Sequence, residues 1–217
     1  MPQTEKAKRE LVAIPGPSGT LEGILSTPST ALTQGLTVIC HPHPLHEGTM
    51  NNKVVHFLAK TFTDNGFAAL RFNFRGVGNS EGQYGEGKGE TADTLAAISW
   101  LRCQHNPTLP LWLAGFSFGG YTSLSAANQN KVAGLVSVAP AVHLFDFNTL
   151  SHPECPWLVI QGEKDDIVEC DSVLSWTKQM SPAPELITLP DAGHFFHGQL
   201  NLLKTHVAAF IQAHASP

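Results

Sequence analysis

The chain has 217 residues, 42% of them hydrophobic and 14% charged, which suits one globular domain over residues 1–217 with a substantial core. Its formal net charge of −5, without any run of five basic residues, argues against nucleic-acid binding. A polar first segment and the lack of ~18 consecutive apolar residues lead us to expect a cytoplasmic protein that does not associate with membranes.

Short apolar runs alternate along the chain with longer segments of helical period. This alternation predicts a mainly parallel sheet with helices on both faces. We expect a strand pair at 10–16 and 20–28, further strands at 36–40, 68–74, 111–116, 134–140, 157–162 and 185–190, and helices at 51–66, 89–104, 117–129, 172–180 and 200–214. No repeat or low-complexity block interrupts the series, so we expect no internal domain boundary.

Ser117 lies in the sequence Gly-Phe-Ser-Phe-Gly at 115–119, where a predicted strand becomes a helix. Ligands bind at this carboxyl edge of a parallel sheet. A tight strand-to-helix turn strains its central residue and crowds its neighbours, which the glycines at 115, 119 and 120 would relieve. These features favour a nucleophile over an idle serine in a glycine-rich turn.

A serine nucleophile needs a histidine to take its proton and a carboxylate to orient that histidine. The strand at 157–162 runs into Asp165 and Asp166, and both qualify by type. The strand at 185–190 runs into a loop with His194 and His197. We favour His194, which follows a glycine, because His197 is expected to begin a helical segment and face solvent.

The oxyanion that forms in such a reaction needs backbone N–H donors already in place. One is expected from Phe118, directly after the nucleophile, and the second from the loop after the strand at 36–40. Prolines at 42 and 44 have no N–H, so the centre of that loop can donate only from His43 or Leu45. The sequence leaves this choice open.

Two other chemistries are weighed and ranked lower. His41 and His43 could chelate zinc, but the proline between them restricts the geometry, and no acid or cysteine nearby completes a tetrahedral set. We therefore expect no metal and interpret His41 as a buried loop histidine. The cysteines have no C-x-x-C spacing and none lies in a nucleophile turn, so they are expected to be reduced and not catalytic: Cys40, Cys103, Cys155 and Cys170.

Five segments together resemble the α/β-hydrolase superfamily: the serine turn, the loops at 41–55, 71–82 and 161–168, and the loop at 193–197. More closely, they resemble its small, lid-poor intracellular serine hydrolases of the dienelactone-hydrolase-like or esterase-like kind. The resemblance spans roughly residues 10–214 and implies an α/β-hydrolase fold of about eight strands, one of them antiparallel near the start.

The resemblance implies Ser117 as nucleophile, His194 as base and Asp165 as acid, because the superfamily's acid lies three residues after a glycine, here Gly162. It also implies that Arg75 and Gly76 shape a loop near the site, supported by Asp93. The chain departs from the pattern at 46–48, where His-Glu-Gly replaces a usual Gly-Gly pair. Dienelactone hydrolases proper use a cysteine nucleophile, so lactone activity is not implied.

We therefore expect a cofactor-free serine hydrolase that cleaves a small carboxylic ester through an acyl-enzyme. The segment at 141–156 is long enough for a short turn but not for a cap domain, which predicts short acyl chains. The alternatives are a small serine aminopeptidase or amidase, with Glu47 as a candidate for binding an amino terminus, and a hydrolase-fold binding protein without activity. The oligomeric state does not follow from the sequence.

Overall fold

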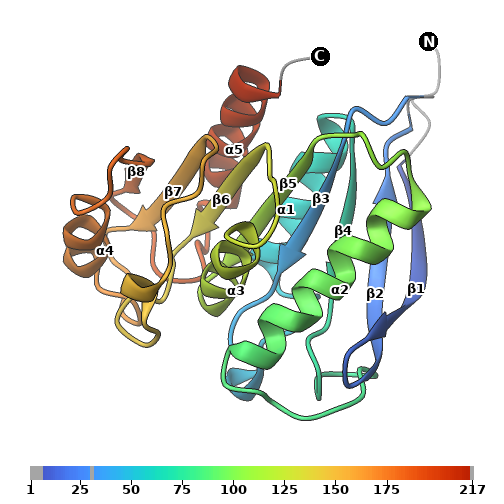
Figure 1. The fold of residues 1–217 in the computed structure, drawn as a ribbon. Helices are drawn as coiled ribbons and strands as arrows, with labels where there is room; N and C mark the ends of the chain where they lie inside the picture. The colour runs from blue at the N-terminus through green and yellow to red at the C-terminus, as the bar shows by residue number, and fades with distance from the viewer. Residues whose placement is uncertain (1–6, 30–31, 216–217) are drawn as a thin grey trace.

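The fold is built on one mixed sheet, seen in a computed structural model that describes residues 7–29 and 32–215 (Figure 1). Its eight strands run in the order β1-β2-β4-β3-β5-β6-β7-β8. All neighbours from β4 to β8 are parallel, whereas β2 is antiparallel to both β1 and β4. The prediction of a mainly parallel eight-stranded sheet with one antiparallel strand near the start is confirmed.

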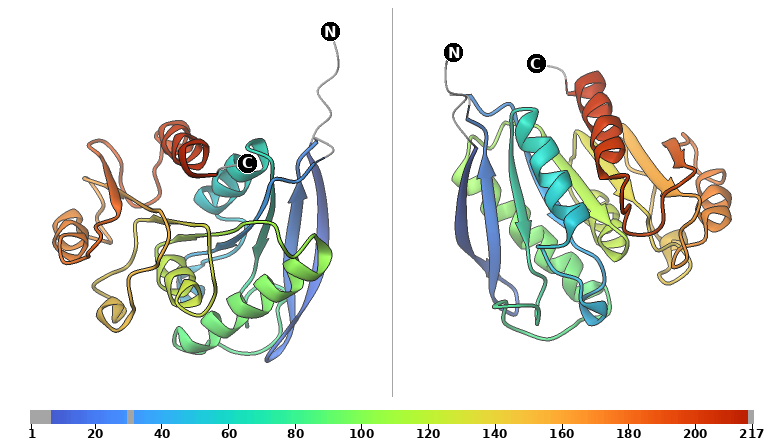
Figure 2. Two further views of the ribbon diagram at one scale, coloured as in Figure 1. Left: turned by 45° about the horizontal axis from the view of Figure 1, so that its top comes forward. Right: turned by 180° about the vertical axis from the view of Figure 1, so that it is seen from behind.

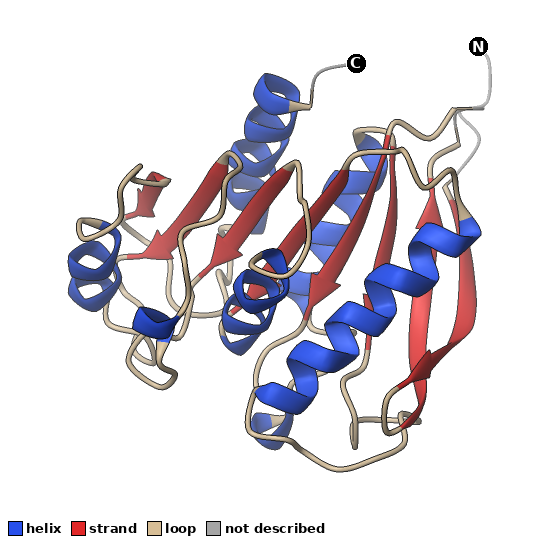
Figure 3. Cartoon of the chain, in the orientation of Figure 1, coloured by secondary structure: helices blue, strands red, loops and turns tan. Residues whose placement is uncertain are grey.

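The elements follow the alternation expected from the sequence (Figure 3). The strands are β1 (Lys8–Gly16), β2 (Gly19–Thr27), β3 (Gly35–Cys40), β4 (Phe67–Phe72), β5 (Leu111–Phe116), β6 (Gly134–Val138), β7 (Trp157–Gly162) and β8 (Glu185–Leu189). The helices are α1 (Lys53–Asp64), α2 (Lys88–Gln104), α3 (Phe118–Ala127), α4 (Cys170–Thr177) and α5 (Leu200–His214), with 3-10 turns η1 (Pro44–His46) and η2 (Phe147–Thr149).

Helices cover both faces of the sheet because its central strands are apolar on both sides. Every residue of β3, β4, β5, β6 and β7 is buried, as expected for parallel strands packed between two helical layers. One core packs under α2, α3 and α4, and the other packs under α1 and α5. Figure 2 shows the α1 and α5 layer from behind.

The connection between β6 and β7 carries no cap domain. It runs from residue 139 to 156 and contains only the single turn η2. Phe147 of this turn is buried against Trp176 and Tyr121, with ring centroids 5.1 and 5.4 Å away. The predicted short turn is therefore confirmed, and the carboxyl edge of the sheet stays uncovered by any inserted helical layer.

No helix in residues 7–29 and 32–215 combines the length and the apolar character required to cross a bilayer.

Substitution of Trp112 tests the core that lies between the sheet and the helices α1 and α5. It is fully buried and packs edge-to-face on Phe62, Phe67 and Phe210, with ring centroids 5.7–5.9 Å apart. We expect Trp112→Ala to lower the free energy of unfolding by about 3–5 kcal/mol, measured by urea denaturation. Leu11→Ala is the control: Leu11 is 74% exposed, and its loss should change stability by no more than about 0.5 kcal/mol. Equal effects would contradict this description of the core.

Candidate active site

Ser117 occupies the turn between β5 and α3 in a backbone conformation that few residues adopt. Its φ of 55° and ψ of −116° lie in a sparsely populated region for a residue with a side chain. Three backbone hydrogen bonds hold the turn: the Ser117 N–H donates to the Val138 carbonyl at 2.9 Å, and the Ser117 carbonyl accepts from the N–H groups of Gly120 and Ala141 at 2.9 and 3.5 Å. The surrounding sheet therefore stabilises a strained turn that presents Ser117 at the carboxyl edge.

Two glycines allow the chain to pass itself at this turn. A Cβ on Gly115 would lie 2.0 Å from the Gly119 carbonyl oxygen, and a Cβ on Gly119 would lie 2.2 Å from the Cys40 carbonyl oxygen. Neither position can take a side chain without moving backbone. Gly120 is less constrained, since its Cβ would lie 3.2 Å from Pro140. The expected relief of crowding is thus strongest at 115 and 119.

Asp165 and His194 come together from the loops after β7 and β8. His194 Nδ1 lies 2.8 Å from Asp165 Oδ2, and both side chains are almost fully buried. Asp166, the other candidate acid, is exposed. The loop therefore orients its two adjacent aspartates in different ways, one toward His194 and one toward solvent.

The Asp165 carboxylate accepts several further hydrogen bonds. The N–H groups of Ile167 and Val168 donate to Oδ1 at 2.9 and 2.7 Å, and Gln161 Nε2 donates to Oδ2 at 3.0 Å. Burial raises the pKa of Asp165, but the hydrogen bonds from His194 and Val168 outweigh it and hold the pKa below its ordinary value. The carboxylate is therefore charged at neutral pH and fixed in position.

His194 lies beside the serine turn. Its ring centroid is 4.9 Å from that of Phe116, the residue before Ser117, and only 4% of His194 is exposed. The hydrogen bonds of the described residues include none between Ser117 Oγ and His194; such contacts are often long before substrate binds. His197 is exposed and precedes α5, which begins only at Leu200, so the expectation that it begins a helix is wrong.

The loop after β3 lies next to the start of α3, as the close approach of Cys40 to Gly119 shows. Phe118 is the first residue of α3, where backbone N–H groups have no acceptor within the helix. The Leu45 N–H donates to His43 Nδ1 at 3.2 Å. Of the two amides left open by the sequence, the one of Leu45 is therefore already engaged.

The His-Glu-Gly sequence at 46–48 closes this loop in a tight turn. Glu47 adopts the left-handed conformation, with φ 58°, and is exposed. A Cβ on Gly48 would lie 2.1 Å from the Pro42 carbonyl oxygen, so only glycine fits there. Where the superfamily usually has a Gly-Gly pair, this chain thus keeps glycine at the crowded position 48 and has a strained glutamate at position 47.

His41 is a buried structural histidine, as expected. Its Nδ1 donates to the Pro42 carbonyl at 2.6 Å, and its Nε2 accepts from the Phe74 N–H at 3.0 Å. Burial lowers its pKa to about 3, so the ring is neutral. Both ring nitrogens are used, which leaves no lone pair to bind a metal. The described residues contain no group of three or more histidine, cysteine or acidic side chains positioned around a common metal position.

The four cysteines are free thiols. Cys40 lies closest in the chain to the site loops, is buried, and contacts Thr94 Oγ1 at 3.5 Å. Burial raises its pKa to about 11, so the thiolate that nucleophilic attack requires is scarce at neutral pH.

Arg75 and Asp93 support the loop at 73–87 in the expected way. Arg75 Nη2 and Nε donate to the two oxygens of Asp93 at 2.7 and 3.0 Å, and the Arg75 N–H donates to the same carboxylate at 3.0 Å. Gly76 has a φ of 73°, which a side chain would strain. The fully buried Asp93 therefore fixes both the side chain and the backbone of Arg75.

An aromatic wall lies beside the serine turn, and sequence reasoning missed its member Tyr84. The hydroxyl of Tyr84 lies 3.1 Å from His43 Nε2, and the rings of Phe118 and Phe145 lie 5.1 and 5.8 Å from that of His43. Tyr84 stands in a glycine-rich loop with no motif to mark it. Gln161 was also missed, although a polar residue in an otherwise apolar buried strand is a usable signal.

Fold and site together define a class: the protein is an α/β-hydrolase of the serine hydrolase kind. The model of the family described as X-Pro dipeptidyl-peptidase (S15 family) matches residues 24–153. The chain belongs to this family, within the α/β-hydrolase superfamily.

Individual relatives agree with this assignment. An α/β serine hydrolase without lid from Xanthomonas campestris is 37% identical, with a TM-score of 0.90 and 97% of each chain covered. An α/β serine hydrolase homologue from Coxiella burnetii is 44% identical, with a TM-score of 0.88 over 92% of this chain and 96% of that one. An uncharacterized protein of Rickettsia prowazekii is 37% identical over 191 residues, 83% of this chain and 79% of its own.

Proposed function

We propose that the protein hydrolyses small carboxylic esters through an acyl-enzyme formed on Ser117, with His194 as the base and Asp165 as its partner. The observation that carries the proposal is the hydrogen-bonded Asp165–His194 pair beside the strained turn of Ser117. A structural role alone would not require a strained serine next to a buried histidine that is hydrogen-bonded to a carboxylate.

The proposed reaction uses these side chains in sequence. Ser117 Oγ attacks the acyl carbon, its proton passes to His194 Nε2, and the protonated histidine then gives that proton to the leaving alcohol. Water, activated in the same way, releases the acid. Asp165 holds Nδ1 of His194 at 2.8 Å, which leaves Nε2 to exchange protons and stabilises the imidazolium.

The oxyanion is proposed to bind the N–H of Phe118 and the N–H of His43. Phe118 follows the nucleophile at the start of α3, where its N–H has no intrahelical acceptor. His43 is preferred to Leu45, whose amide donates to the His43 ring. The contact between His43 Nε2 and the Tyr84 hydroxyl would stiffen this loop, so the donor is in place before charge develops.

A peptidase is the second candidate, supported by the match to the S15 family. An exopeptidase of this kind would be expected to hold the positive amino terminus of its substrate with a carboxylate. Two acids near the serine turn are engaged: Glu90 accepts from the amides of Gly85 and Gly87, and Asp93 is paired with Arg75. Glu47, expected from the sequence as the candidate, is exposed on a strained turn. Ester hydrolysis is therefore the better supported of the two functions.

The first prediction concerns the proposed nucleophile. Ser117→Ala and His194→Ala should each abolish turnover of p-nitrophenyl acetate, because both act in one proton-transfer step. A fluorophosphonate probe should label the wild type at Ser117 and should not label Ser117→Ala, as read by intact mass. Circular dichroism controls for folding. More than a few per cent residual turnover in purified Ser117→Ala would contradict Ser117 as the nucleophile. An unlabelled wild type would favour a binding protein without this chemistry.

The second prediction uses the adjacent aspartates as a matched pair. Asp165→Asn should lower kcat by about 10⁴, since an amide no longer stabilises the histidine in its required tautomer. Asp166 is the next residue in the chain and is exposed. Asp166→Asn removes the same charge and should keep most of the activity. Steady-state kinetics on the same ester measure both. Reversed effects would show that the loop presents the other carboxylate in the working enzyme.

The third prediction concerns substrate size. Phe145 contacts Phe118 and Tyr121, with ring centroids 4.9 and 5.3 Å away, so the uncapped site ends at an aromatic wall. A longer acyl chain gains ~0.8 kcal/mol per methylene only while it is buried. We expect kcat/KM to peak at four acyl carbons or fewer across p-nitrophenyl esters from acetate to palmitate, without interfacial activation.

Adding amide substrates to this panel separates the two candidate activities. X-Pro-p-nitroanilides should be turned over far more slowly than p-nitrophenyl acetate. Faster cleavage of the anilides would favour the peptidase, and a steady rise of kcat/KM to palmitate would require an apolar tunnel that the aromatic wall excludes.

A further inference from the structure

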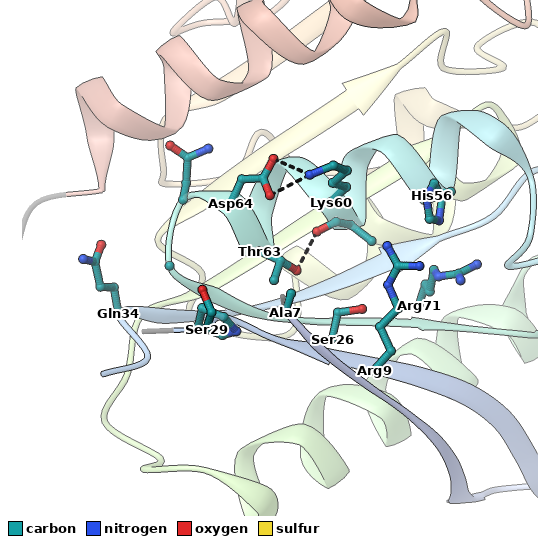
Figure 4. Close-up of a pocket in the computed structure, with 14 residues that line it drawn as sticks. Ala7, Arg9, Ser26, Ser29, Gln34, His56, Lys60, Thr63, Asp64 and Arg71 are labelled. Carbon is teal, nitrogen blue, oxygen red and sulfur yellow. Dashed lines mark hydrogen bonds and ion pairs between the residues drawn. The ribbon is translucent and has the colours of Figure 1, made fainter. Parts of the chain in front are cut away.

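A cavity of about 1040 Å³ lies between α1 and the strands β1, β2 and β4, and Ser117 is not among its lining residues. Figure 4 shows its basic end, where the guanidinium groups of Arg9 and Arg71 lie beneath the ring of His56. Its other end is lined by polar side chains that include Gln34 and Asn65. The Ser117 mechanism uses none of these groups.

Strand register explains why the basic residues converge. Arg71 on β4 lies opposite Ile24 on β2. Two residues along β2, on the same face, Ser26 lies between Ala69 of β4 and Arg9 of β1. Directly opposed residues point to the same face of a sheet, so Arg9, Ser26 and Arg71 all face the α1 side. α1 packs mainly on β4 and β3, whereas α2 packs on β1 from the other face. Figure 2 shows β1 and β2 beside α1 on this face of the sheet, and Arg9 and Ser26 from these strands line the cavity.

Arg71 is a buried cation to which no carboxylate of residues 7–29 and 32–215 is hydrogen-bonded or ion-paired. It is 6% exposed, and Nη1 donates to the Met50 carbonyl and to Asn51 Oδ1 at 2.5 and 2.9 Å. Both acceptors are neutral. A buried charge is costly unless an opposite charge balances it, and the recorded contacts of Arg71 involve only one of the guanidinium nitrogens.

Arg9 adds positive charge beside Arg71 instead of balancing it. Burial and the neighbouring Arg9 lower the pKa of Arg71. Burial, then Arg71, Arg9 and Lys60, lower the pKa of His56. The carboxylate in the cavity lining, Asp64, is already paired with Lys60 at 2.9 Å and with Lys204 at 2.6 Å. Among the described residues, neither Arg9 nor Arg71 forms an ion pair, so positive charge gathers at this end of the cavity although the protein is acidic overall.

We propose that this cavity binds a small organic phosphate, with its phosphate group held by Arg9, Arg71 and the Ser26 hydroxyl beside His56. Two guanidinium forks and a hydroxyl offer more donors than one carboxylate can accept, and they match the oxygens and double charge of a phosphate. The cavity is far larger than the ion itself. The organic part of the ligand would extend along α1 toward Thr63, Asn65 and Gln34.

The test uses inorganic phosphate as the probe, titrated into the full chain at constant ionic strength. Calorimetry measures affinity and NMR follows the pKa of His56. Phosphate should bind and raise the His56 pKa, because an anion counteracts Arg9 and Arg71. Arg9→Gln should weaken binding about tenfold, the loss expected for one charge-assisted contact. Arg9 is exposed on β1 and its loss should leave folding and ester turnover intact.

Arg102→Gln is the matched control, since it removes the same charge from α2 on the opposite face of the sheet. Its phosphate affinity should equal that of the wild type. Equal weakening by Arg9→Gln and Arg102→Gln, or an unchanged His56 pKa at saturating phosphate, would overturn the proposal. Succinate, titrated in the same way, tests whether the site prefers a carboxylate. Tighter binding of succinate than of phosphate would overturn the assignment to a phosphate ligand. Neither result depends on the activity of Ser117.

Discussion

The strained backbone at Ser117 is the constraint from which the rest of the site follows. A φ of 55° persists only where neighbouring structure over-determines it. Here β6 supplies the acceptor for the Ser117 N–H, and the loop after β3 presses against Gly119. Three neighbouring strands thus define one turn. These contacts are possible because β3, β5 and β6 are neighbours at the centre of the sheet.

The partner side chains depend on the same sheet edge but are held by different means. Asp165 is fixed by two backbone amides and by Gln161, a residue of β7 itself, so the carboxylate position is set by a strand and its first turn. Within residues 7–29 and 32–215, no backbone amide donates to the His194 ring. Its position is set by Asp165 on one side and by the ring of Phe116 on the other. Substitution of Asp165 would therefore change the orientation of His194 as well as its charge balance.

Periodicity predicted the sheet and helices within a few residues because buried parallel strands and helices differ clearly in length and pattern. It predicted Ser117, Asp165 and His194 as candidates because each follows a strand. It could not choose between His43 and Leu45, since that depends on a local hydrogen bond within η1. Nor could it find Tyr84 or the cluster of Arg9 and Arg71. These contacts join segments 41 and about 60 residues apart, and cross-strand register, which brings Arg9 and Arg71 together, is not visible in either segment alone.

The basic cavity and the loop that leads from β3 to α1 share one anchor. Arg71 donates to the Met50 carbonyl and to the Asn51 side chain. Asn73, which directly follows β4, accepts from the Met50 N–H at 2.8 Å. The segment that begins with His43 is thus tied to β4 before α1 starts. Arg71 therefore has two roles, one toward the cavity and one toward the loop, and its removal would disturb both. Arg9 faces the cavity from β1 and makes no contact with that loop among the recorded hydrogen bonds of the described residues. A substitution at Arg9 therefore reports on the cavity's charge, whereas one at Arg71 would also report on the geometry of the proposed oxyanion loop.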